Sequence, residues 1–247
     1  MYDAKEMASF PPSVEQWRDL LAQLGPDLPI DFVLASIAEE SGGNNCSLGI
    51  PGVEAGIMQT FHPADDRFGA TFSQLRVNCA GGTPTRALTQ SEQLLQAQVA
   101  VNAIRAFRDQ ARQRLAAVGA SWPEDSADFW NFVKLGHGLP AMQTDLLRQI
   151  TANLGRAPTS WSEFSDIALS MSPGEYPASL VGFAAAPSTG GRQNRIADVL
   201  ANAETAGKFG GGILSVLTSS PAAAIVIVGG AAAILVYLIR KRRQRRR

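Results

Sequence analysis

Apolar side chains recur every three or four residues along most of the chain before residue 210, which is the period of an amphipathic helix. The longest example covers about residues 90–118. Because one face of such a helix is buried, we expect its apolar stripe to lie in the core and not to form a cofactor site. The stripe consists of Ala97, Val101, Ile104, Ala111, Leu115 and Val118.

The same period predicts several other helices. The first begins near Ser13, because Ser13-Val14-Glu15-Gln16 has the spacing of a capping box, and the second runs from about Asp31 to Glu40. Residues 42–56 are rich in Gly, Asn and Pro and are predicted to form a loop. No alternation of apolar and polar residues is long enough for a useful strand, so the predicted fold class is mostly α. Later helices are expected at about 126–135, 141–154, 161–171 and 193–206, with Gly136-His137-Gly138 interrupting the helical pattern.

The chain divides into four predicted parts. A helical body covers residues 10–175, and Pro-, Gly- and Ser-rich sequence then predicts a linker with one short helix over 176–209. A transmembrane helix is predicted over 210–240, followed by a basic tail over 241–247.

The membrane prediction depends on an uncharged run from Ala222 to Ile239. A helix of that length is about 27 Å long, close to the roughly 30 Å of a bilayer's hydrocarbon core. Tyr237 lies near its end, where an interfacial ring is favoured. A buried core helix is the alternative, but the adjoining cluster of cations is typical of a membrane face.

Charge is segregated along the chain. The formal net charge is +0, yet the stretch from Arg240 to Arg247 holds seven of the 22 basic residues and no acid. The rest of the chain is therefore acidic, which argues against a nucleic-acid-binding body. With 45% hydrophobic residues, the chain can bury a sizeable core.

Cys46 and Cys79 leave two interpretations open. They are either two half-buried thiols or one disulfide that ties the loop after Glu40 to a later loop. A disulfide requires an oxidising compartment. Their spacing is not that of a metal site, and we expect neither a metal nor a cofactor.

Two segments carry a resemblance to a known family. Ile37-Ala38-Glu39-Glu40-Ser41-Gly42-Gly43-Asn44 reads as a helix ending on a carboxylate, and Ala55-Gly56-Ile57-Met58-Gln59-Thr60-Phe61-His62-Pro63-Ala64 follows after a loop. Together they resemble the lytic transglycosylases and goose-type lysozymes, enzymes that cleave peptidoglycan. The resemblance covers about residues 28–64 well. It implies a lysozyme-like helical domain.

Glu40 is the predicted catalytic acid. It shares a helix face with Val33 and Ile37, and a carboxyl in a partly apolar cleft at a helix C-terminus has a raised pKa. Glu39 shares a face with Phe32, Ala35 and Ser36, so periodicity alone does not separate the two acids. The resemblance separates them, because the family's catalytic Glu is followed by Ser, as in Glu40-Ser41.

The resemblance also implies the substrate-binding positions. The family's Gly and Met-Gln segment lines the glycan cleft, which transfers to Gly56, Met58 and Gln59, with Ser41 beside the acid. Gly56 would let the backbone approach a sugar, and Gln59 would hydrogen-bond hydroxyl and acetamido groups. Met58 is expected to serve packing more than ligand contact.

The chain departs from the family at one element. Lytic transglycosylases usually carry Tyr-Asn-Ala-Gly-x-Gly, whose tyrosine supports the catalytic Glu, whereas this chain has Val133-Lys134-Leu135-Gly136-His137-Gly138. A lysine beside Glu40 would lower the pKa of the carboxyl and oppose acid catalysis, so we do not expect Lys134 in contact with Glu40. His137 is expected to be structural.

The resemblance implies cleavage of the β-1,4 bond between the two peptidoglycan sugars. One clear acid favours a transglycosylase, which forms a 1,6-anhydro product, over a lysozyme-type hydrolase, which commonly uses two carboxylates. The missing tyrosine supports an alternative of another class: a catalytically inactive module that binds glycan or scaffolds a membrane assembly.

The expected location follows from the anchor. The positive-inside rule places the basic tail in the cytoplasm or virion interior, yet Met1–Met7 has no secretory signal. We therefore expect either an anchor that exports the body itself or, as favoured, a virion-borne enzyme that opens the wall during viral genome entry. Expected partners are glycan strands, a bilayer, and either anionic lipid or nucleic acid at the tail.

Overall fold

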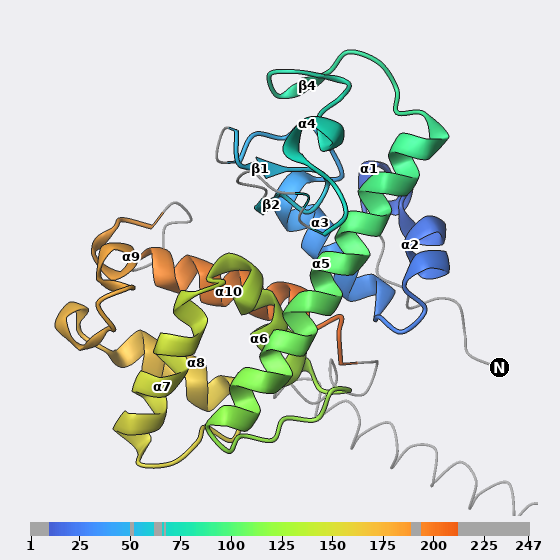
Figure 1. The fold of residues 1–247 in the computed structure, drawn as a ribbon. Helices are drawn as coiled ribbons and strands as arrows, with labels where there is room; N and C mark the ends of the chain where they lie inside the picture. The colour runs from blue at the N-terminus through green and yellow to red at the C-terminus, as the bar shows by residue number, and fades with distance from the viewer. Residues whose placement is uncertain (1–9, 50–51, 62–65, 67, 189–193, 212–247) are drawn as a thin grey trace, which may run out of the picture.

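The structure is a computed structural model that describes residues 10–49, 52–61, 66, 68–188 and 194–211 (Figure 1). The described part is mostly helical, as predicted. Its elements in chain order are α1 (Pro12–Glu15), α2 (Arg18–Leu24), α3 (Ile30–Ser41), β1 (Glu54–Ala55), β2 (Thr60–Phe61), α4 (Phe72–Leu75), β3 (Cys79–Ala80), β4 (Thr83–Pro84), α5 (Gln90–Ala117), α6 (Ala127–Gly138), α7 (Met142–Leu154), α8 (Trp161–Ser170), the 3₁₀ turn Pro173–Glu175, α9 (Val181–Ala185) and α10 (Arg195–Gly207).

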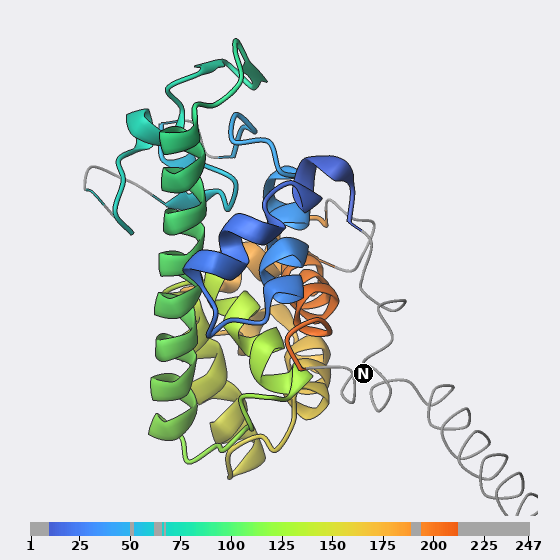
Figure 2. The same cartoon turned by 90° about the vertical axis from the view of Figure 1, so that its right-hand side faces the viewer.

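Helix α5 runs the length of the body, with α2 and α3 lying between it and α10 (Figure 2). Thr89 begins it with a capping box, because its side chain accepts from the backbone of Glu92 while Glu92 reaches back to the Thr89 N–H. The predicted stripe is confirmed for Ala97, Val101, Ile104, Ala111 and Leu115, which are buried. Val118 lies just beyond the end of α5 and is half-buried against the core.

Helices α6 and α10 pack closely against each other. A Cβ on Gly207 would lie 1.8 Å from the side chain of Asn131, and one on Gly210 would lie 2.1 Å from the ring of Trp130. The backbones therefore approach to a distance that only glycine permits. Ile196, Leu200 and Ala203 join the main core from the α10 side, so α10 belongs to the body. The described part of the predicted linker 176–209 is thus packed structure that extends the body beyond residue 175.

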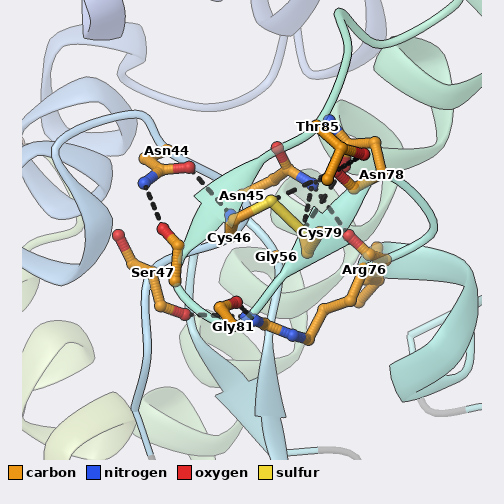
Figure 3. The surroundings of a disulfide bond; sticks show 12 residues. Asn44, Asn45, Cys46, Ser47, Gly56, Arg76, Asn78, Cys79, Gly81 and Thr85 are labelled. Carbon is orange, nitrogen blue, oxygen red and sulfur yellow. Dashed lines mark hydrogen bonds between the residues drawn. A yellow bond between two sulfur atoms is a disulfide. The ribbon is translucent and has the colours of Figure 1, made fainter.

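The segment between α3 and α5, residues 42–89, is here named the loop lobe; its described part contains α4 and two short antiparallel hairpins, β1–β2 and β3–β4. Cys46 and Cys79 form a disulfide that joins the loop after α3 to β3 (Figure 3). The open question of their pairing is thereby answered. Buried Asn45 donates to the Leu75 carbonyl at 3.0 Å and to the Asn78 Oδ1 at 2.8 Å.

Two sequence expectations differ from the structure at the ends of helices. The predicted capping box at Ser13 does not form, because α1 begins after Pro11 without a side-chain cap. Helix α6 continues through Gly136 and ends at Gly138, although an interruption at Gly136-His137-Gly138 was expected. A Cβ on Gly136 would lie 2.9 Å from Gln143 and one on Gly138 would lie 2.9 Å from Val199, so both glycines permit close packing.

No helix among the residues that the structure describes combines the length and the apolar character needed to cross a bilayer. Of the predicted transmembrane segment 210–240, only Gly210 and Gly211 belong to the described residues. The rest of that segment and the basic tail 241–247 lie outside them.

Candidate active site

The two acids of the motif lie in the last turn of α3. The helix ends where Gly42 adopts a left-handed conformation, with φ of 60°, which glycine accommodates readily. The preceding residues Phe32–Ile37 are all buried, so α3 is fixed in the core up to its final turn. This packing places Glu39 and Glu40 at a defined position, with 19% and 27% of their side chains exposed.

Glu40 is held by two side chains of α6. The Lys134 ammonium donates a hydrogen bond to Glu40 Oε1, and His137 Nδ1 lies 2.9 Å from the same oxygen. The expectation that Lys134 stays away from Glu40 is therefore wrong. The contact arises because α6 places Lys134 and His137 three residues apart on one face, toward the end of α3.

These contacts reverse the expected pKa shift of Glu40. Burial alone would raise the pKa of this carboxyl, but the charges of Lys134 and His137 and their hydrogen bonds outweigh burial. The pKa of Glu40 is held well below its usual range, so the expectation of a raised value is wrong. At neutral pH, Glu40 is an ionised carboxylate.

Glu39 has the opposite shift. Its Oε2 lies 3.5 Å from the Lys134 ammonium. Burial raises its pKa, the lysine charge lowers it, and the neighbouring Glu40 carboxylate raises it again, with a result of about 7. A carboxyl that titrates there is partly protonated at neutral pH and can donate a proton.

Lys134 and His137 are themselves enclosed. Their side chains are only 4% and 7% exposed, and the His137 ring packs against Phe107 with 5.3 Å between centroids. A buried ammonium requires a compensating negative charge, which α3 supplies. The sequence signal for this pair is a lysine inside the apolar run Phe132-Val133-Lys134-Leu135, but the sequence does not say which acid meets it.

Ser41 connects α3 to the first hairpin. Its hydroxyl donates to the Ile57 carbonyl at 2.6 Å and accepts from the Gly43 N–H at 3.1 Å. Ile57 belongs to the turn Gly56–Gln59 that joins β1 to β2. Ser41 therefore fixes the turn beside the two acids, and its hydroxyl is engaged with the protein's own backbone.

The other predicted substrate-binding residues form that turn. Gly56 has φ of 79°, and a Cβ there would lie 3.0 Å from the Gln96 amide oxygen. Met58 is 1% exposed and belongs to the core, in line with the expected packing role. Gln59 is 6% exposed, with φ of 47°; its amide donates to the Gly56 carbonyl at 2.8 Å. The structure thus brings all four predicted positions next to the end of α3, with Met58 and Gln59 turned inward.

Two hollows on the described surface lie elsewhere. One of about 750 Å³ lies between α2 and the start of α5, with Trp17, Leu20 and Leu94 among its lining residues. The other, of about 630 Å³, is lined by residues that include Pro26, Asp27 and Trp130. Neither is lined by Glu39 or Glu40. Among the described residues, no group of three or more His, Cys, Asp or Glu side chains is placed to hold a metal ion.

Comparisons of the chain with protein-family models, with curated proteins and with solved structures found no match.

Proposed function

We propose that the body is a peptidoglycan lytic transglycosylase that cleaves the β-1,4 bond between N-acetylmuramic acid and N-acetylglucosamine. The observation that carries the proposal is the pair of carboxyls in the last turn of α3, one held ionised by Lys134 and His137 and one with a pKa of about 7. Environments that push the pKa values of two acids apart are typical of glycan-cleaving sites. The motif resemblance assigns the acid to Glu40.

The proposed reaction needs one acid that works twice. A protonated carboxyl of the pair gives its proton to the leaving glycosidic oxygen as the bond from that oxygen to C1 breaks, and the bonding electrons stay on the oxygen. The same carboxyl then accepts the proton of the muramic acid C6 hydroxyl while that oxygen bonds to C1. The product is a 1,6-anhydro sugar, and no water is consumed.

The proposed place of action is the bacterial cell envelope. The uncharged run Ala222–Ile239 and the following cations support attachment to a membrane, and the Cys46–Cys79 disulfide supports folding under oxidising conditions. A virion-borne enzyme that opens the wall during genome entry meets both requirements. Detection of the protein in purified virions supports this location, and its absence from them contradicts it.

The test is product analysis on purified sacculi. We expect the full-length chain in detergent to release muropeptides with a 1,6-anhydro ring, and the double variant Glu39→Gln/Glu40→Gln to release none while keeping its circular dichroism spectrum. Products with a reducing end would favour a lysozyme-type hydrolase. Sedimentation with sacculi without any soluble product would favour the alternative, an inactive glycan-binding or structural module supported by the missing family tyrosine.

A further inference from the structure

A single buried ammonium serves two carboxylates in the candidate site. Lys134 donates to Glu40 and lies 3.5 Å from Glu39, and its side chain is almost fully enclosed. The ammonium is hydrogen-bonded to Glu40 and lies farther from Glu39, so its charge compensates mainly that of Glu40. In a partly dry site, the second carboxyl is therefore more stable in its neutral, protonated form.

His137 decides which carboxyl stays charged. Its Nδ1 lies 2.9 Å from Glu40 Oε1, the oxygen that also accepts from Lys134, and 3.4 Å from the lysine nitrogen itself. Two donors thus meet on one oxygen of Glu40. Among the described residues, Glu39 pairs only with the ammonium, at 3.5 Å, so the two carboxyls are stabilised unequally.

We propose that Lys134 and His137 act as positioning residues that occupy the carboxylate of Glu40 and leave Glu39 as the proton donor of the site. This inference rests on the proposed function, and it changes the residue that the sequence motif selects. Glu39 then protonates the leaving oxygen and, as a carboxylate, accepts the proton of the C6 hydroxyl. Glu40 stays negative throughout and stabilises the positive charge that develops at C1.

The other charged groups around α3 are engaged elsewhere. Asp31, at the opposite end of the helix, pairs with Arg18. Among the neighbouring helices, Glu15 of α1 pairs with Arg18, and Arg105 and Arg108 of α5 pair with Asp27. On α10, Asp198 accepts from the Ser188 hydroxyl and Glu204 pairs with Lys208. In the described part of the chain, the ion pairs of Glu39 and Glu40 are those with Lys134 and His137.

The first test reads the two charges directly and does not depend on activity. The full-length chain, labelled with ¹³C at the Glu carboxyls, is titrated by NMR in detergent, and the Glu39→Gln and Glu40→Gln variants assign the two signals. We expect Glu39 to titrate near pH 7 and Glu40 to stay ionised well below the usual range of a carboxyl. Lys134→Met should move the Glu40 transition up to about pH 4–6, close to that of an ordinary carboxyl. A Glu40 that titrates near 7, or no change in Lys134→Met, would overturn the inference.

The second test asks which acid delivers the proton. Glu39→Gln should lower the initial rate of anhydro-muropeptide release by roughly 10²–10⁴-fold, the usual contribution of a general acid. The matched control is Glu204→Gln, an exposed acid of α10, which should keep the full rate. In the unmodified protein the rate should fall as pH rises through about 7, because Glu39 then loses its proton.

Substitution of Lys134 or His137 should change the acid side of the dependence of rate on pH. Lys134→Met and His137→Phe should bring an acid limb into the range of about pH 4–6, since Glu40 is then no longer held ionised. His137→Gln retains a hydrogen-bond donor and should shift the limb less. A full rate in Glu39→Gln with a lost rate in Glu40→Gln would overturn the inference and leave the proposed function standing. An inactive unmodified protein would overturn both.

Discussion

The loop lobe lies beside one end of the long helix α5 and the helices α6–α10 beside the other, and the two regions are stabilised by different interactions (Figure 1). Helices α6–α10 bury a continuous apolar core that includes Phe132, Phe164 and Leu200. Among its described residues, the loop lobe contributes Ile57 and Met58 to that core, and Ala55, Ala70 and Leu75 pack with Val99 of α5 in a small separate cluster. The Cys46–Cys79 disulfide and hydrogen bonds from polar side chains to the backbone stabilise the loop lobe in addition to this small apolar cluster.

The difference teaches how the candidate site is built. Its acids come from the end of α3, next to the loop lobe, whereas Lys134 and His137 come from α6. All four side chains therefore come from the region fixed by apolar packing, at its border with the loop lobe, which the Ser41 hydroxyl contacts through the Ile57 carbonyl. Perturbing each region separately shows how much each contributes.

The largest effect is expected at the α6–α10 contact. Gly207→Ala would place a methyl group 2.4 Å from the backbone nitrogen of Asn131, so the helices must separate. We expect a loss of about 3–5 kcal/mol in the free energy of unfolding, measured by chemical denaturation. The matched control is Gly182→Ala in α9, where a Cβ meets nothing within 4 Å. Equal stability of the two variants would contradict the close packing of α6 and α10.

The next effect concerns the disulfide. Replacing Cys46 and Cys79 with Ser releases a cross-link between residues 33 apart, which should lower the free energy of unfolding by about 2–4 kcal/mol. Hydrogen exchange should accelerate within residues 42–89 and stay slow in α6 and α10. Reductant should have the same effect on the unmodified protein and none on the double variant. Uniform acceleration across the body would show that the two regions unfold together.

A smaller effect is expected from the polar network of the loop lobe. Asn45→Ala removes the donor to Leu75 and Asn78. The Leu75 carbonyl keeps its hydrogen bond from Gln96, but the buried Asn78 Oδ1 loses its amide donor, so we expect a loss of about 1–3 kcal/mol. Asn153→Ala, at an exposed position on α7, is the control and should change stability by less than about 0.5 kcal/mol. If the two variants unfold at the same denaturant concentration, this network does not stabilise the lobe.

The smallest effect should be the same in both regions. Glu92 pairs with Arg86 at the start of α5, and Glu163 pairs with Arg156 at the start of α8; each pairing lowers the pKa of its carboxyl to about 2. A lowered pKa stabilises the fold above the unfolded value of about 4.5, and the gain is lost as pH falls toward 2. Glu92→Gln and Glu163→Gln should each slightly reduce the loss of stability between pH 5 and pH 2.5, measured by thermal unfolding. A response in one variant alone would mean that the surface pairs also distinguish the regions.

Much of the helical framework could be predicted from spacing alone. The helices predicted at 90–118, 141–154 and 161–171 correspond closely to α5, α7 and α8, because an apolar stripe reports directly on a buried helix face. The short helix expected at 193–206 likewise corresponds to α10, but its packing against the body was not predicted. Gly207 permits the close contact with α6, and a single glycine at a helix end does not reveal its partner in the sequence.

The candidate site was only half predictable. A local motif singled out Glu40 and the turn Gly56–Gln59, which the structure brings next to each other. The partner of Glu40 lies 94 residues later in the sequence, and no local pattern specifies such a contact. Lysine within an apolar run indicates only that some acid must neutralise it. The pKa order of Glu39 and Glu40 follows from that contact, so the sequence could not supply it.

Gly210 packs closely against the ring of Trp130, and this contact has a mechanical consequence. Trp130 lies one helical turn before Lys134 on α6. Tension applied to the chain beyond Gly211 would therefore be transmitted first to the helix that holds the lysine and histidine of the candidate site. A body pulled from this end would bear the load at the candidate site, and the rate of the proposed reaction would then respond to the applied force.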